Sequence, residues 1–131
     1  MFDWAEHVAG IGFVACQTYL TATGACARIS KAIALQLGPR HEASGRPIVM
    51  AINSAANFWK HYPEWPLEKK TDRQDAVRRA FDDLGFSADG EYPLSGILTE
   101  LTYGVARFGA LLVPLEQWRD ELMKGEAQQP N

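Results

Sequence analysis

Three side chains able to hydrogen-bond or carry a proton follow one another at intervals of four residues: Asn53, Asn57 and His61. Each step of four residues turns an α-helix by about 400°, so they would form one polar row along a helix. An imidazole changes its charge near neutral pH, and a carboxamide both donates and accepts hydrogen bonds. Half-buried amides usually bond to neighbouring helices or loop carbonyls. We therefore expect a structural role first, with a binding or catalytic surface at Asn57 and His61 as the alternative.

Cationic and aromatic residues surround this row. Lys60 would project about 100° away from His61 around the helix, and the stretch 47–66 contains the densest aromatic cluster of the sequence. Aromatic side chains beside polar donors are frequent anchors of protein interfaces, although core packing is the expected role of Trp59. The candidate binding surface consists of Asn53, Asn57, Trp59, Lys60, His61, Tyr62 and Trp65.

The segment Ala56-Asn57-Phe58-Trp59-Lys60-His61 resembles the Arg-Asn-x-x-x-His motif of the HEPN superfamily. These are small all-helical domains, often dimeric, of bacterial toxin–antitoxin and defence systems, and many are metal-independent ribonucleases. The position of the family's arginine is Ala56, and a methyl group cannot replace a guanidinium with five hydrogen-bond donors. A wider pattern, A-N-[YF]-x-K-H-x-x-E-W, is similar to a segment of uncharacterised small bacterial proteins.

Two functional hypotheses follow from the row and the resemblance. The favoured one is a non-catalytic helical module that binds another protein, in an antitoxin, immunity or defence setting. The alternative is a degenerate HEPN-like ribonuclease, in which His61 would be the general acid or base, Asn57 would position the substrate and Lys60 would supply the cation. RNA is a partner only under this alternative.

Composition and motifs exclude several other classes. The chain has 131 residues, of which 47% are hydrophobic, enough for one domain with its own core. Its net charge of −3 gives no overall attraction to nucleic acid or an anionic membrane. It contains no phosphate-binding glycine loop, no GxSxG and no HExxH, and its three histidines are far apart. We expect no metal site, no cofactor and no conventional active site.

A long helix is predicted over residues 3–37, and small residues such as Gly10, Gly12 and Gly24 would let another helix approach it closely. That helix could belong to the same chain or to a second copy, which leaves a homodimer through the Ala/Gly-rich first helix as one alternative. The polar Gln17 and several hydroxyls make the uncharged run from Val8 to Ala27 too polar for a membrane span. An alternating three-four spacing, typical of the seam of a bundle or coiled coil, is followed by Val8, Ile11, Ala15, Tyr19, Ala22, Cys26, Ile29, Ile33 and Leu37.

The rest of the sequence predicts shorter helices, and together they give an all-α fold: a four- to five-helix bundle with one long N-terminal helix. Residues 1–124 would form a single domain and 125–131 a flexible tail. Cys16 and Cys26 would lie about 15 Å apart on one helix, too far for a disulfide, and reduced thiols indicate the cytoplasm. The predicted segments after the first helix are a solvated loop at 38–46, a helix at 47–62, a connector at 64–70 and a helix at 72–84. Another helix is predicted from Ser95, with a core stripe that runs from Ile97 to Leu112. Pro114 either kinks this helix or begins a fifth one.

Overall fold

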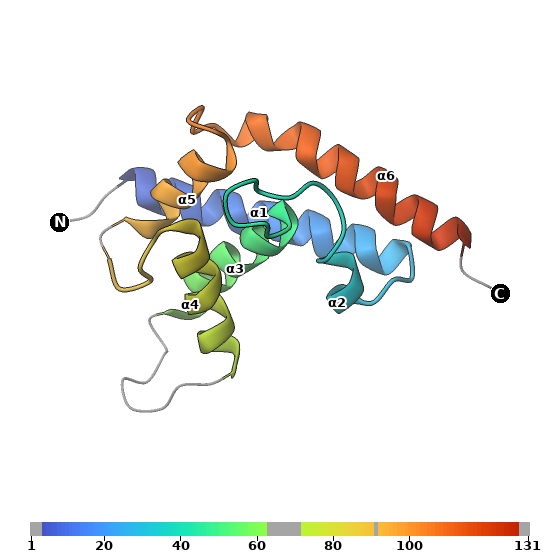
Figure 1. Ribbon diagram of the computed structural model, residues 1–131, viewed down its shortest axis with the longest axis horizontal. Coiled ribbons are helices and arrows are strands. Elements are labelled where there is room, and N and C mark those ends of the chain that lie inside the picture. The colour runs from blue at the N-terminus through green and yellow to red at the C-terminus, as the bar shows by residue number, and fades with distance from the viewer. Residues whose placement is uncertain (1–3, 63–71, 91, 129–131) are drawn as a thin grey trace.

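The computed structural model is all-α, as predicted, and describes residues 4–62, 72–90 and 92–128. Figure 1 shows α6 running beside α1 along the long axis of the molecule, with α3 and α4 below one half of α1 and α5 overlapping that same half. None of the described helices is long and apolar enough to cross a membrane. The elements are α1 (Trp4–Cys26), α2 (Lys31–Ala34), α3 (Ile48–His61), α4 (Asp72–Leu84), α5 (Pro93–Leu101), the 3₁₀ helix η2 (Phe108–Leu111) and α6 (Leu112–Gln128).

The central helix α3 lies where the sequence predicted it and carries the expected buried stripe. Val49, Ile52 and Ala56 are completely buried. Pro47 precedes the helix as its N-cap instead of occupying the first turn, with φ −57° and ψ 136°. The three-four spacing thus identified both the helix and its inward face, because a helix packed on one side buries residues at that period.

The first helix is shorter than predicted. α1 ends at Cys26, where Arg28 adopts a left-handed conformation with φ 59°. The N–H of Ile29 donates to the carbonyl of Gly24 at 3.2 Å and the N–H of Arg28 to that of Ala25 at 3.1 Å, the pattern of a Schellman termination. The spacing concealed this break because Ile29 folds back onto the core, as the residue after such a cap commonly does.

The inward face of α1 also differs from the predicted seam. The seam residues on this helix are exposed, and the buried residues are Ala9, Gly10, Phe13, Gln17, Leu20 and Gly24. A Cβ atom at Gly10 would lie 2.2 Å from the Trp59 ring, and one at Gly12 would lie 2.3 Å from the Phe108 ring. The prediction of close approach at these glycines is therefore confirmed within the chain, and the aromatic rings that it admits decide which face turns inward.

The helix predicted from Ser95 begins earlier and ends sooner. α5 starts at Pro93, because the Glu6 carboxylate of α1 accepts the N–H groups of Leu94 at 2.8 Å and Ser95 at 2.9 Å. Such a cap from a distant helix satisfies donors that the first turn leaves unpaired, and no local pattern reveals it.

After α5 the chain turns, which corrects the predicted core stripe. Tyr103, Gly104 and Ala106 all have positive φ angles. Val105 and Leu112, both within the range of the predicted stripe, are 55% and 59% exposed. Pro114 lies in the first turn of α6, so the alternative in which it begins a new helix is correct.

α4 matches its predicted range; on this helix Gln74 is buried and Ala76 is exposed. α6 continues to Gln128, so residues 125–128 of the predicted tail are helical. The predicted connector at 64–70 lies outside the described residues.

The loop at 38–46 is anchored to the core, contrary to the prediction of a solvated connector. His41 is 1% exposed, and the backbone N–H of Gly38 donates to Glu121 of α6 at 2.8 Å. Gly38 has φ +84° and passes so close to α6 that a Cβ atom there would lie 2.9 Å from the Cβ of Trp118. The loop therefore contributes buried contacts that its charged composition did not predict.

We expect Gly38→Ala to lower the free energy of unfolding by about 2–4 kcal/mol, combining left-handed strain with overpacking against Trp118. The matched control is Gly45→Ala, where φ is +72° and no atom lies within 4 Å of the added Cβ. Gly45→Ala introduces the left-handed strain alone and should lower the free energy of unfolding by about 1 kcal/mol. Urea unfolding measures both, and equal losses would contradict the close packing at Gly38.

Candidate functional site

Two members of the polar row join α3 to α1. The Gln17 side chain of α1, which is buried, donates from Nε2 to Oδ1 of Asn53 and to Oδ1 of Asn57, both at 2.9 Å. One carboxamide group has two N–H bonds, so it can serve both oxygens. The structural role expected of the two asparagines is confirmed. Their bridging partner was missed because Gln17 lies on the face of α1 opposite the predicted seam.

The position of the HEPN arginine faces the core. Ala56 is completely buried beside Ala55 and Ile52. A side chain at this position points away from the edge of α3 that carries Asn57, because adjacent residues are rotated by about 100° around a helix. The motif residues Asn57 and His61 therefore stand beside a hydrophobic position, with no cation supplied by Ala56.

The outer end of the row lies at the C-terminal end of α3. Lys60 is exposed and His61 half-buried. The hydroxyl of Tyr62 donates to Oδ1 of Asp89 at 3.3 Å, and Arg78 of α4 donates to Oδ2 of the same carboxylate at 2.8 Å. Asp89 thus ties the end of α3 to α4. Trp65, also a candidate binding residue, lies outside the described residues.

A groove of about 720 Å³ opens beside this end of α3. Its described walls come from α1, α3 and the residues 88–90 and 92–93, and they are mainly apolar and aromatic. Two charged residues line the described part of the groove: Lys60 and Glu6. The Glu6 carboxylate already accepts three hydrogen bonds from Leu94 and Ser95. The apolar and aromatic wall residues are Ile11, Val14, Phe58, Trp59, Tyr62, Ala88, Tyr92 and Pro93.

Trp59 contributes to both the core and the groove. Its ring covers Gly10 and meets the His7 ring edge-on at 4.9 Å between centroids. The expected core packing of Trp59 is confirmed, since the ring packs against the hydrophobic core. Its remaining surface lines the groove beside Lys60. One side of the ring is therefore fixed by packing while part of it stays available for contact.

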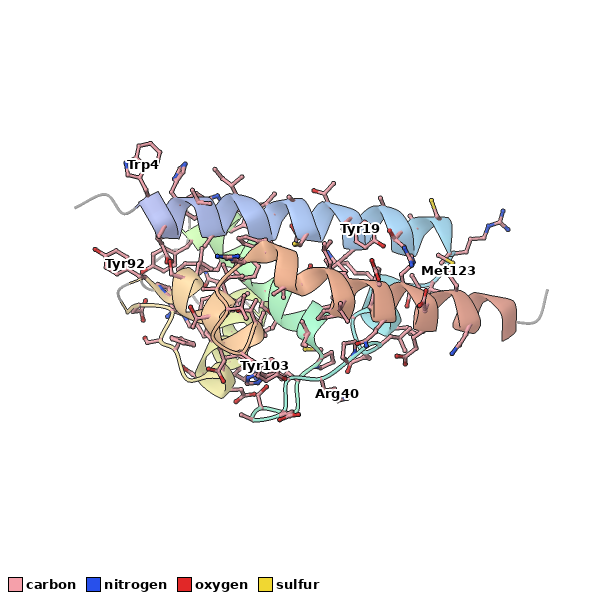
Figure 2. All side chains as sticks on the ribbon, turned by 90° about the horizontal axis from the view of Figure 1, so that it is seen from above. Trp4, Tyr19, Arg40, Tyr92, Tyr103 and Met123 are labelled. Atoms are coloured by element: carbon pink, nitrogen blue, oxygen red, sulfur yellow. The ribbon has the colours of Figure 1, made fainter. Side chains whose placement is uncertain are left out.

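A second polar cluster, not predicted from the sequence, fixes the loop 38–46 to α5. The backbone N–H of Ser44 donates to Nδ1 of His41 at 3.2 Å, so Nε2 carries the proton and donates to Glu100 at 2.9 Å. The Tyr103 ring stacks on the His41 imidazole with 6.1 Å between the ring centroids, and Figure 2 shows Tyr103 beside the loop. The Ser44 hydroxyl is 2.8 Å from Nδ1 and accepts the N–H of Arg46 at 3.2 Å. Because these contacts close a turn and join it to a helix, we interpret the role of the cluster as structural: it fixes the loop 38–46 to α5.

The described residues contain no group of three or more His, Cys, Asp or Glu side chains that could hold a metal ion. The chain matches no protein-family model, no curated protein and no solved structure. The HEPN resemblance stays a prediction from the motif.

We expect Gln17→Leu to lower the free energy of unfolding by about 2 kcal/mol, because the carboxamides of Asn53 and Asn57 would lose their buried donor. Thr18→Leu is the matched control: it lies on the same helix, is exposed, and should change stability by less than about 0.5 kcal/mol. Thermal and urea unfolding give both values. A Gln17 variant as stable as the Thr18 variant would show that the bridge contributes little.

Proposed function

We propose that this chain is a non-catalytic helical module that binds another protein, and that the groove beside the end of α3 is its binding surface. The observation that carries the proposal is the groove itself. It combines apolar and aromatic walls with one outward-facing ammonium group, that of Lys60, among the described lining residues. Hydrophobic grooves of this kind bind the apolar side chains of a partner segment.

The chemistry of the lining indicates what the partner should present. Trp59, Tyr62 and Tyr92 offer large, partly exposed rings, the residue type that dominates binding energy in many interfaces. Lys60 is the cation at the groove, whereas the charge of Glu6 is occupied in capping α5. A partner segment with apolar side chains and a carboxylate placed near Lys60 would complement this surface.

Two contacts support binding over catalysis. Oδ1 of Asn57 accepts a hydrogen bond from the buried Gln17, so the Asn57 side chain is engaged in joining α3 to α1. The buried Ala56 offers no charge to a phosphate, and electrostatic stabilisation is usually the largest contribution to catalysis. The antitoxin, immunity or defence setting implied by the resemblance, and self-association through the first helix, belong to the same proposal.

We expect Lys60→Glu to lower the affinity for the partner by at least about tenfold, because it places like charges opposite each other. Lys124→Glu makes the same change at an exposed site on α6, away from the groove, and should leave binding unchanged. The partner is identified by affinity purification from the source cells, and its Kd is then measured with both purified variants. Equal affinities for the two variants would remove the groove from the proposal.

Incubation with labelled single-stranded RNA in EDTA tests the ribonuclease alternative. The expected result is no cleavage beyond that of buffer, for the native chain and for His61→Ala alike. Cleavage by the native chain that is lost in His61→Ala would overturn the non-catalytic function, since histidine is the group that the motif assigns to proton transfer.

A further inference from the structure

The outer face of α1 is uncharged and mainly apolar. Figure 2 shows α1 running along one edge of the molecule, with Trp4 projecting outward. Val8 and Ile11 are 56% and 54% exposed. Every exposed position of the helix holds an uncharged residue: Trp4, Ala5, Val8, Ile11, Ala15, Thr18, Tyr19, Thr21, Ala22, Ala25 and Cys26. A solvent-facing helix normally carries charged residues on its outer side, so this face has the character of an interface.

The spacing of the exposed residues is the same read in either direction. Trp4, Val8, Ile11, Ala15, Tyr19, Ala22 and Cys26 form the outer stripe, and their intervals are symmetrical about Ala15. The stripe repeats after 11 residues, which make three helical turns with a drift of only about 20°. It therefore runs almost straight along the whole of α1, a length of about 34 Å.

This symmetry fits a second copy of the same helix running in the opposite direction. A two-fold axis at Ala15 would place residues whose numbers sum to 30 opposite each other, and bulky side chains then face small ones at both ends. The facing pairs would be Trp4 with Cys26, Val8 with Ala22, Ile11 with Tyr19, and Ala15 with its own copy. Small residues at the crossing point permit the axial separation of about 8 Å at which helices pack closely.

The size of the face sets the expected strength of this contact. A strip about 34 Å long and one helix wide supplies roughly half of the 800 Å² per partner that stable interfaces bury. The rest can come from α6, whose exposed Leu112 lines a second hollow together with Ala15 and Tyr19; Glu116 and Arg119 also line this hollow and add charged groups at the edge of the contact. The contact is therefore at the weak end of specific interfaces.

We infer that two copies of this chain associate through the outer faces of α1, antiparallel about a two-fold axis at Ala15. The inference rests on the proposed function in one respect, because that proposal already includes self-association of the chain through its first helix. The dimer surface differs from the binding groove beside the end of α3. Ile11 borders both surfaces, so neither set of variants changes it. Partner binding and dimerisation can therefore fail separately.

Sedimentation velocity across about 1 µM to 1 mM, the range expected for a small interface, tests the association. The mass should rise with concentration from 14.5 kDa towards twice that value. Ala15→Glu should weaken the dimer at least about 100-fold, because two carboxylates would meet at the axis. Thr21→Glu is the matched control: it adds the same charge at an exposed position about 120° around the helix and should leave the dimer intact. A constant monomer mass for the native chain, or equal dimerisation of the two variants, would overturn the inference.

Disulfide trapping tests the direction and the register. In a Cys16→Ala/Cys26→Ser background, Ala15→Cys should give a covalent dimer under mild oxidation. Ala22→Cys should not, because in an antiparallel pair the two sites would lie about 21 Å apart, beyond the reach of a disulfide. Cross-linking at Ala22 as efficient as that at Ala15 would indicate parallel helices and reject the proposed axis. Circular dichroism confirms that each variant is folded, and Lys60→Glu should leave dimerisation unchanged.

Discussion

The contact between α1 and α3 fixes the position of everything else. The Trp59 ring lies where a side chain on Gly10 would be, and Gln17 donates to both asparagines of α3 at 2.9 Å. Sliding one helix by a turn, about 5.4 Å, would leave two carboxamide oxygens without their donor and bring the ring against a different residue. Shape and hydrogen bonding therefore select the same register, and α3 then offers its far end to the groove.

Contacts from distant parts of the chain hold the shorter elements on this pair of helices. Glu6 of α1 caps α5, and the buried His41 joins its loop to Glu100 of the same helix. The Trp118 indole of α6 donates to the carbonyl of Ala34 at 2.8 Å, closing the end of α2. Each contact satisfies a polar group that a short helix or a loop leaves unpaired, which is how a chain with abrupt turns retains defined positions for its helices.

The packing of α1 has a consequence for its outer side. Its inward face uses glycines and a glutamine, because aromatic rings and carboxamides of other elements fill the space. Phe13 and Leu20 are buried with them, whereas the apolar residues Val8 and Ile11 are left outside. The same helix thus supplies one wall of the proposed binding groove and the surface of the proposed dimer, and both follow from which of its faces turns inward.

The sequence by itself determined the helical class, the extent of α4, the inward stripe of α3 and the structural role of the two asparagines. These depend on period, proline and glycine signals, and the rule that half-buried amides find partners, all of which act within one helix. It did not determine the face of α1 that is buried, the start of α5 at Pro93, or the burial of His41, and it did not show the groove. Those features depend on residues far apart in the chain: rings that require Gly10 and Gly12, a carboxylate at Glu100, and a cap from Glu6. Only the folded chain brings these groups together, because each contact joins elements whose relative positions no local pattern specifies.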